Sequence, residues 1–352
     1  MPSPKPISLG DHCVGAGGRP FVIAEVSGNH NGSLERALEI VDAVAGSGAQ
    51  AVKLQTYTAD TITIDADGPQ FRIRSDHDLW GGRTLYDLYT EAHTPWEWHA
   101  PLYARAREHG LLPFSSPFDP TAVELLESLG TQVYKIASAE VVDLPLIRLV
   151  ASTGKPMIIS SGMATLAEID AALNAARDGG CTEMVLLACT ASYPALPQDS
   201  RLLSIPTLEA AFAIPIGLSD HTKGIGVAVA AVALGAVAIE KHVTLARSDG
   251  GVDSDFSLEP AELTSLVEAV NVARLAVRPA RFGPKPSEQD TLRVRRSLYV
   301  VQDVRSGDPV SPQNVRSIRP SGGLATDLMD TVVGRRFVRD VPRGTPLTWD
   351  LI

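Results

Sequence analysis

Short apolar runs alternate with amphipathic segments along the first two-thirds of the chain. Eight runs rich in Val, Ile and Leu are each five or six residues long, and most end in a polar residue. Runs of this length and composition are typical of strands buried in a parallel sheet. They cover residues 21–26, 51–55, 112–116, 133–138, 157–161, 184–189, 214–219 and 237–242.

The segments between these runs have apolar residues at helical spacing. In residues 34–47, the side chains of Ala37, Ile40, Val41 and Val44 would share one face of a helix. The same spacing predicts helices over 96–109, 120–129, 144–153, 166–178 and 205–212. Eight strands alternating with helices predict an α/β fold, namely a (β/α)8 TIM barrel. A doubly wound open sheet is the alternative, but its Gly-rich phosphate loop after the first strand is missing.

The connection between the second and third predicted strands is unusually long. It runs from about Tyr57 to Leu111 and has room for more than one helix. Within it, residues 61–74 alternate around Asp67, Gly68 and Pro69, which predicts a hairpin. An insertion at this end of a barrel often covers the active site, but it can also be a surface loop. The sequence favours neither interpretation.

The pattern changes near Gly283, so we expect residues 1–282 to form the barrel and residues 283–352 a linker and a small C-terminal domain. From Gly283 onward, ten arginines and one lysine face eight acidic residues, a net charge of +3. The whole chain carries −10, so the preceding part carries −13. Short apolar runs broken by Gly and Pro predict a mainly irregular β domain.

Composition narrows the function classes. With 44% hydrophobic and 20% charged residues, the chain is typical of a folded globular protein. Its acidic balance disfavours nucleic acid and membrane surfaces as partners. The apolar run at 224–239 is too short to span a bilayer and predicts a buried helix followed by a strand. Three cysteines without metal-type spacing, and an N-terminus without an apolar signal segment, predict a reduced cytoplasmic protein.

Polar side chains follow nearly every predicted strand. In a TIM barrel the active site lies at the carboxyl ends of the strands, so these residues would converge on one site. The polar residues at these positions are Glu25, Lys53, Gln55, Ser115, Ser116, Lys135, Ser138, Glu140, Ser160, Ser161, Thr190, Tyr193, Ser219, Asp220, His221, Glu240, Lys241 and His242. Cys189 also ends a strand, but we interpret it as a small core residue because no base is evident beside it.

His221 and His242 would lie on neighbouring strand ends, beside Asp220 and Glu240. Neutral imidazoles placed in this way can ligate a divalent metal, which could polarise a carbonyl group. A lone buried histidine is more often structural, but two together favour a metal. Two ligands make a weak site, which fits a metal completed by water or substrate.

Lys53 and Lys135 lie inside apolar runs, where an unpaired ammonium group is costly. They could bind a phosphate or carboxylate together with nearby serine hydroxyls, or pair internally with Glu25 or Glu140. A Schiff-base lysine, as in barrel aldolases, is a third interpretation. Glu25 itself could be a general base, a ligand of a sugar hydroxyl or part of a structural ion pair.

At these residues the chain resembles the sialic acid synthase family, which condenses phosphoenolpyruvate with an amino sugar. The resemblance extends from about Phe21 to the C-terminus. It rests on FVIAEVSGNHNG (21–32), AVKLQ (51–55), FSSPF (114–118), YKIASAE (134–140), GLSDHTKGI (217–225) and IEKHVTL (239–245). RRSLYV (295–300), SIRP (317–320) and GRR (334–336) resemble that family's antifreeze-protein-like (SAF, β-clip) domain.

The resemblance implies roles for individual residues. His221 and His242 match the family's metal ligands, and Arg319 matches an arginine that a partner subunit inserts over the sugar. Glu25, Glu140, Glu240 and Asp253 match acidic residues of the active site. The matches to the phosphoenolpyruvate and sugar site are Lys53, Gln55, Ser116, Phe118, Lys135, Ser138, Tyr193 and Ser219.

By resemblance we therefore expect an enzyme that uses Mn²⁺ or Mg²⁺, phosphoenolpyruvate and an acetamido sugar, and forms a domain-swapped homodimer. Stretches such as LYDLYTEAHTPWEWH (85–99) resemble the pseudaminic acid branch, whose substrate is a 6-deoxy diacetamido hexose of the altrose type. Ala191 stands where sialic acid synthases carry an asparagine, which disfavours a plain sialic acid synthase. The sialic and legionaminic acid synthases are the related alternatives, and a non-catalytic carbohydrate-binding protein is the alternative from another class.

Overall fold

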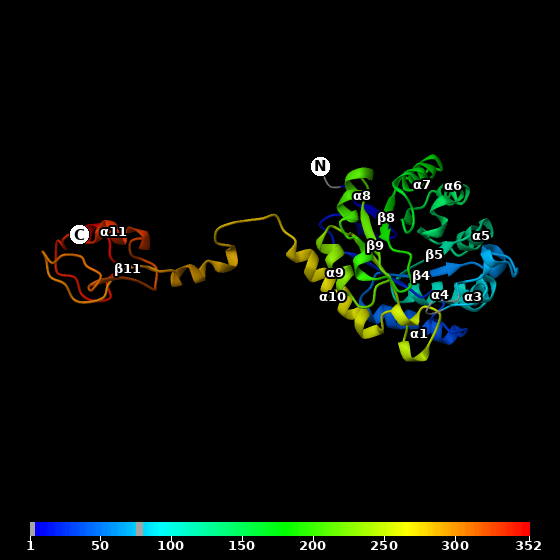
Figure 1. Cartoon of the computed structure of the whole chain (residues 1–352), viewed down its shortest axis with the longest axis horizontal. Coiled ribbons are helices and arrows are strands. Elements are labelled where there is room, and N and C mark those ends of the chain that lie inside the picture. Colours follow the sequence, from blue (N-terminus) through cyan, green and yellow to red (C-terminus); the bar gives the residue numbers. More distant parts are fainter. Residues whose placement is uncertain (1–3, 75–79) are drawn as a thin grey trace. The chain divides into compact units, whose positions relative to one another are not determined.

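A computed structural model describes residues 4–74 and 80–352. The chain divides into two compact units, Met1–Arg278 and Pro279–Ile352 (Figure 1). No helix in the described ranges is long and apolar enough to cross a membrane.

The first unit is a closed barrel of eight parallel strands, which confirms the predicted fold. Its strands pair in chain order, and β10 closes the barrel by pairing with β3. The strands are β3 (Phe21–Glu25), β4 (Ala51–Thr56), β5 (Leu112–Pro117), β6 (Tyr134–Ile136), β7 (Met157–Ser160), β8 (Met184–Cys189), β9 (Ile216–Ser219) and β10 (Ala238–His242). A short antiparallel pair, β1 (Ile7–Leu9) and β2 (His12–Val14), precedes them.

A helix follows each barrel strand and covers its outer face. Outward residues such as Val22, Val52 and Leu54 pack against the apolar faces of these helices. The helices are α1 (Leu34–Ser47), α4 (Trp96–Glu108), α5 (Pro120–Ser128), α6 (Leu144–Ser152), α7 (Leu166–Asp178), α8 (Ser204–Phe212), α9 (Gly226–Ala233) and α10 (Pro260–Ala276). Side-chain caps fix several of their starts, as at Ser33 before α1 and Asp119 before α5.

The long connection after β4 departs from the prediction. It contains two additional helices, α2 (Ala59–Ile62) and α3 (Leu85–Ala92), and the hairpin expected over 61–74 is wrong. Thr58 and Thr61 cap each other's backbone at the start of α2, which favours a helical turn over a strand. A single bridge between Arg72 and Thr84 is the described β contact of this segment.

The second unit has its own small core. Strands β11 (Ser297–Val300) and β12 (Val315–Ile318) pair antiparallel, and α11 (Met329–Val332) follows. Ten buried apolar residues, among them Leu298, Val315 and Phe337, form the core. At Gly323 a Cβ atom would lie 2.1 Å from the Leu298 carbonyl oxygen, so only glycine allows the chain to pass there.

Candidate active site

The barrel interior changes character along each strand. Alternate residues of a strand point to the same face, so Phe21, Ile23 and Glu25 of β3 all point inward. Phe21 and Ile23 lie in the apolar cluster that fills one end of the interior. Glu25 lies at the carboxyl end of the strand and lines a cavity of about 390 Å³. The same change from apolar to polar occurs in β4, β6 and β10.

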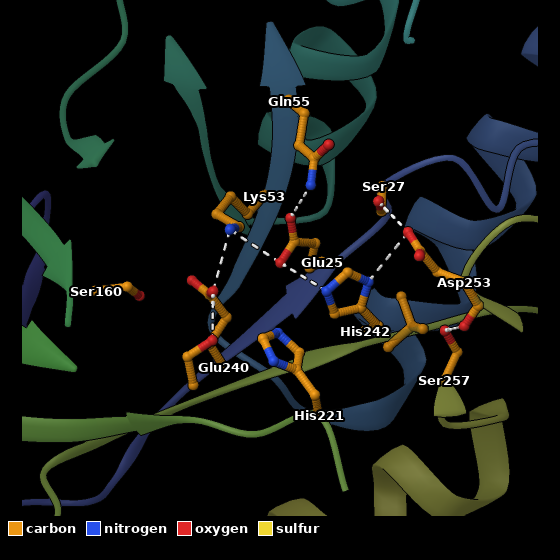
Figure 2. Close-up of polar contacts among 12 residues, drawn as sticks. Glu25, Ser27, Lys53, Gln55, Ser160, His221, Glu240, His242, Asp253 and Ser257 are labelled. Atoms are coloured by element: carbon orange, nitrogen blue, oxygen red, sulfur yellow. Dashed lines mark hydrogen bonds and ion pairs between the residues drawn. The ribbon is translucent and has the colours of Figure 1, made fainter. Parts of the chain in front are cut away.

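An ionic network forms the floor of this cavity (Figure 2). The Lys53 Nζ atom lies 2.9 Å from Glu25 Oε2 and 3.1 Å from Glu240 Oε1, and all three side chains are almost fully buried. Gln55 donates a hydrogen bond of 2.7 Å to the other oxygen of Glu25, and Ser219 donates one of 3.1 Å to Glu240. The residues come from four strands, so the closed barrel assembles the network.

Lys135 extends the network across the cavity. Its ammonium group donates a hydrogen bond of 2.7 Å to Ser160 Oγ and lies 3.7 Å from Glu240 Oε1. An internal ion pair therefore exists for both lysines, but Lys135 pairs with Glu240 and not with the expected Glu25 or Glu140. The sequence placed Ser160 at the end of a predicted strand but gave no reason to expect its contact with Lys135.

Interactions between the buried charges shift the pKa values of the carboxylates and lysines in this network. Burial opposes ionisation of Glu25, but the charges of Lys53, His242 and Lys135 outweigh it and lower the pKa of that carboxyl. The pKa of Glu240 is lowered in the same way by both lysines. Burial lowers the pKa of Lys135, whereas Glu240 and Glu25 overcome burial and raise the pKa of Lys53.

His221 and His242 lie side by side at the ends of β9 and β10, with ring centroids 5.3 Å apart. His221 Nδ1 lies 2.9 Å from the Thr190 carbonyl oxygen, which can only accept, so Nδ1 donates this hydrogen bond. Burial would lower the pKa of His221, but a hydrogen bond with Cys189 and the charge of that group raise it. His242 Nε2 lies 3.2 Å from Glu25 Oε2. Burial lowers the pKa of His242, although the neighbouring carboxylates Glu25 and Asp253 act in the opposite direction.

These histidines fit a divalent cation that is completed by substrate oxygens or water. His242 Nδ1 is buried and has no hydrogen-bond partner in the described part of the chain, although Asp253 Oδ2 lies 3.6 Å away. Two lysines face three carboxylates in the cavity lining, so an anionic substrate would need further positive charge. Among residues 4–74 and 80–352, no group of three or more His, Cys, Asp or Glu side chains could hold a metal.

Asp253 and Tyr193 complete the side of the cavity next to the histidines. Ser27 donates a hydrogen bond of 2.5 Å to Asp253 Oδ2, which fixes the orientation of that carboxylate. The ring of Tyr193 lies 4.3 Å from that of His221. Ser27 was not expected from the sequence, because it follows β3 in a loop with no strand pattern of its own.

Cys189 lines the cavity, and the expectation that no base lies beside it is wrong. Burial would raise the pKa of its thiol, but hydrogen bonds with His221 and Ser138 and the charge of Lys135 lower it. Ser138 also accepts a hydrogen bond of 3.1 Å from the backbone N–H of Gly162. Cys189 and His221 are far apart in sequence, and only the pairing of β8 with β9 brings them together.

Much of the apolar lining of the cavity comes from the long connection after β4. The sequence left two interpretations of this connection open, a cover over the active site and a surface loop. Its side chains in the lining are Tyr57, Ile73, Trp80, Leu85, Leu88, Tyr89 and Ala92.

Four predicted residues lie outside this lining. Ser116 lies in buried β5, one residue before its end, and its hydroxyl has no hydrogen-bond partner among the described residues. Phe118 packs its ring 5.1 Å from that of Tyr57. Burial raises the pKa of Glu140 to about 7. Arg319 belongs to the second unit, where it directly follows β12.

Comparison with known proteins gives the same two-part division. The NeuB family profile matches residues 40–280, and the SAF domain profile matches residues 295–352. "Pseudaminic acid synthase" of Helicobacter pylori is 40% identical over 333 residues, which cover 94% of this chain and 97% of that protein. The protein of the same name from Campylobacter jejuni serotype O:2 is 39% identical over 327 residues, covering 93% and 95%.

Among solved structures, the N-acetylneuraminic acid (sialic acid) synthetase of Leptospira borgpetersenii, in complex with citrate, has a similar fold. It superposes with a TM-score of 0.73 at 31% identity, over 82% of this chain and 95% of that chain.

Proposed function

Because the chain belongs to the NeuB family, we propose that it condenses phosphoenolpyruvate with 2,4-diacetamido-2,4,6-trideoxy-altrose to give a nine-carbon acidic sugar, pseudaminic acid, and phosphate. The observation that carries the proposal is the identity of 39–40% to two pseudaminic acid synthases over more than nine-tenths of the chain. The structure at 31% identity, a sialic acid synthetase, stands further away.

The cavity supports a phosphoenolpyruvate site. Lys53 and Lys135 place two ammonium groups beside the hydroxyls of Ser160 and Ser219. Such groups, held in place before substrate arrives and shielded from water, stabilise phosphate and carboxylate charge. Ser116 and Ser138 are further candidate hydroxyls for this end of the substrate.

In the proposed reaction, C3 of phosphoenolpyruvate attacks C1 of the open-chain sugar, and a C–C bond forms. The aldehyde oxygen becomes a hydroxyl, and a positive charge develops at C2. Water adds to C2 and loses a proton, and the bond from C2 to the phosphate oxygen then breaks to leave a ketone. Glu25 lies between Lys53, Gln55 and His242, where it would orient a sugar hydroxyl or accept a proton.

His221 and His242 would hold a divalent metal, Mn²⁺ or Mg²⁺, which supplies a Lewis acid for the sugar aldehyde. Asp253 would bind the sugar from the same side, and Tyr193 would cover it. Glu140, whose pKa burial raises to about 7, would serve as an acid close to Lys135. Three free cysteines fit a reduced cytoplasmic setting for the enzyme.

The enzyme would act as a homodimer in which Arg319 of one subunit reaches the sugar in the barrel of the other. Arg319→Ala and Lys135→Met would each be inactive alone. In a mixed dimer, one site would carry both changes and the other neither, so mixing the two variants should restore activity. Failure to regain activity after verified subunit exchange would refute the swapped arrangement.

The function is tested by measuring phosphate release from phosphoenolpyruvate with Mn²⁺ and each of three sugars. The sugars are the diacetamido altrose, the corresponding diacetamido mannose and N-acetylmannosamine. We expect turnover with the altrose sugar and loss of turnover in excess EDTA. Turnover with another of the three alone would retain the reaction and assign the enzyme to the legionaminic or sialic acid branch. No release with any of them would refute the proposal.

Two other functions give different results in simple experiments. A Schiff-base aldolase would be trapped on Lys135 by borohydride with substrate, whereas the proposed reaction leaves no such adduct. A non-catalytic carbohydrate-binding protein would be stabilised against heat by the sugar and not by phosphoenolpyruvate.

A further inference from the structure

Helix α3 presents one apolar stripe to the cavity. The stripe has helical spacing of three, four and seven residues, so its side chains lie on the same face. Its members are Leu85, Leu88, Tyr89 and Ala92, all of which line the cavity. Asp87, Thr90 and Glu91 lie on the opposite, exposed face of the helix.

Several contacts hold the stripe in a fixed position. Thr84 caps the start of α3 by accepting a hydrogen bond of 3.0 Å from the Asp87 backbone N–H. The ring of Tyr89 packs 5.6 Å from that of Tyr57, at the carboxyl end of β4. At Gly28 a Cβ atom would lie 2.3 Å from Val252 Cγ2 and 3.2 Å from the Ala92 Cα, so this glycine lets the end of α3 approach the barrel.

The surface offers few polar atoms to a ligand. Leu85, Leu88 and Ala92 have neither donor nor acceptor in their side chains, and Val252 continues the apolar surface. The nearby indole N–H of Trp80 already donates a hydrogen bond of 2.9 Å to the Val252 carbonyl oxygen. A hydroxyl group pressed against Leu85 and Ala92 would therefore lose its water without gaining a partner.

An open-chain hexose that reacts at C1 has C6 at its far end. The histidines and carboxylates at the strand ends would hold C1, and the connection that contains α3 leaves β4 at the same end of the barrel and lines the same cavity with apolar side chains. We infer that the α3 stripe, and Leu85 and Ala92 in particular, selects a sugar whose C6 is a methyl group and rejects one whose C6 carries a hydroxyl. The inference rests on the proposed function and assigns a specificity role to the long connection.

The test compares two sugars that differ only at C6, the 2,4-diacetamido-2,4,6-trideoxy-altrose and its 6-hydroxy counterpart. An apolar pocket typically rejects a substrate with one added hydroxyl by about 100-fold. We expect the wild-type enzyme to favour the 6-deoxy sugar in kcat/KM by at least about 10-fold. A ratio near one would overturn the inference even though the proposed function held.

Substitutions in α3 test whether its residues determine the preference for the 6-deoxy sugar. Leu85→Asn and Ala92→Ser each add a hydrogen-bonding group to the stripe and should narrow the ratio at least threefold, mainly by improving the 6-hydroxy sugar. Thr90→Asn makes a comparable change on the outer face and should leave the ratio as in wild type. If both stripe variants keep the wild-type ratio, the inference is wrong; Ala92→Ser is conservative enough to test it should Leu85→Asn misfold.

Binding separates this inference from the proposed function. The rise in melting temperature caused by each sugar alone reports binding without turnover. If neither sugar releases phosphate, the proposed function fails, whereas a larger rise with the 6-deoxy sugar would still support selection by α3. Equal rises with both sugars would count against α3.

Discussion

The two ends of the barrel interior are built from the same eight strands but differ completely in chemistry. At the amino end, Phe21, Ile23 and Phe114 pack with residues of β1 and β2 into an apolar cluster. At the carboxyl end, two residues further along β3 and β4, Glu25 and Lys53 are as deeply buried as their apolar neighbours but are charged. A step of two residues along a strand changes the environment from a hydrophobic core to an ionic network.

This difference separates stability from function. Apolar burial stabilises the fold by about 25 cal/mol per Å² removed from water. A buried ionic network recovers its large desolvation cost only in part, and replacing it by apolar groups is often neutral or stabilising. The carboxyl end is therefore retained for its chemistry, while the amino end supplies the free energy that holds the barrel closed.

The largest expected effect follows from Lys135→Met, which replaces a charge of the network by an apolar side chain of similar length. Phosphate release should fall by about 10²–10³-fold, as when one preorganised charge-stabilising group is removed. Glu240 keeps Lys53 and Ser219 as partners, so the free energy of unfolding should stay the same or rise. Steady-state kinetics and urea unfolding measure the two effects, and a marked loss of stability would contradict the separation of roles.

The opposite result is expected for Ile23→Ala, two residues before Glu25 on the same face of β3. The side chain is fully buried, so its truncation should lower the free energy of unfolding by about 2–5 kcal/mol. The kcat of the folded fraction should remain within about twofold of wild type, because the change leaves the ionic network in place. A kcat loss as large as that of Lys135→Met would show that the two ends are not independent.

Glu140→Gln tests, through the pH dependence of stability, whether a buried carboxyl at the charged end lowers the free energy of unfolding. Burial raises the pKa of Glu140 from 4.5 to about 7, so the folded protein binds a proton that the unfolded chain releases between these pH values. Ionisation of Glu140 therefore lowers stability as pH rises from about 4.5 to 7, and the loss persists above 7. The variant lacks this ionisation and should gain about 3 kcal/mol over wild type at pH 8, and almost nothing at pH 4.5.

Melting curves of both proteins across this pH range test the prediction. Equal pH dependence in wild type and Glu140→Gln would mean that the carboxyl is ionised without cost. The pH profile of phosphate release gives an independent reading, since an inflection near 7 in wild type should vanish in the variant.

The smallest effect is expected for Ser160→Ala, which removes the hydroxyl that accepts a hydrogen bond of 2.7 Å from Lys135. The ammonium group keeps its contact with Glu240, so catalysis should weaken by only about 10-fold, the value of one hydrogen bond to a charged group. The loss should appear in the KM for phosphoenolpyruvate. A change confined to the KM of the sugar would place phosphoenolpyruvate elsewhere in the cavity.

The barrel fold and the position of its polar end could be predicted from the sequence, because local patterns indicate where each strand ends. Apolar runs that end in Glu25, Lys53 or His242 indicated both the barrel and the end at which its polar residues gather. The partners of the lysines could not be predicted, because the pairing of β10 with β3 brings Glu240 beside Glu25 and Lys53 across some 190 residues. Closure of the barrel, and not any local pattern, determines these contacts.

The long connection was predicted least well, for a physical reason. Its residues 61–74 alternate only in places, and the hydroxyls of Thr58 and Thr61 turn the chain into α2 instead of a strand. The stripe of α3 has helical spacing, but whether it faces a cavity or the core depends on close packing at Gly28 and Val252. Sequence periodicity reveals such a face without revealing what it covers.

The most direct test of the central claim follows a labelled oxygen through the reaction. Phosphoenolpyruvate labelled with ¹⁸O at the oxygen that bridges C2 and phosphorus is incubated with the enzyme, Mn²⁺ and the diacetamido altrose. The account predicts that the label leaves with phosphate, in step with formation of a nine-carbon acid. Label retained in the sugar product would contradict cleavage of the C–O bond, and phosphate released equally well without any sugar would contradict condensation.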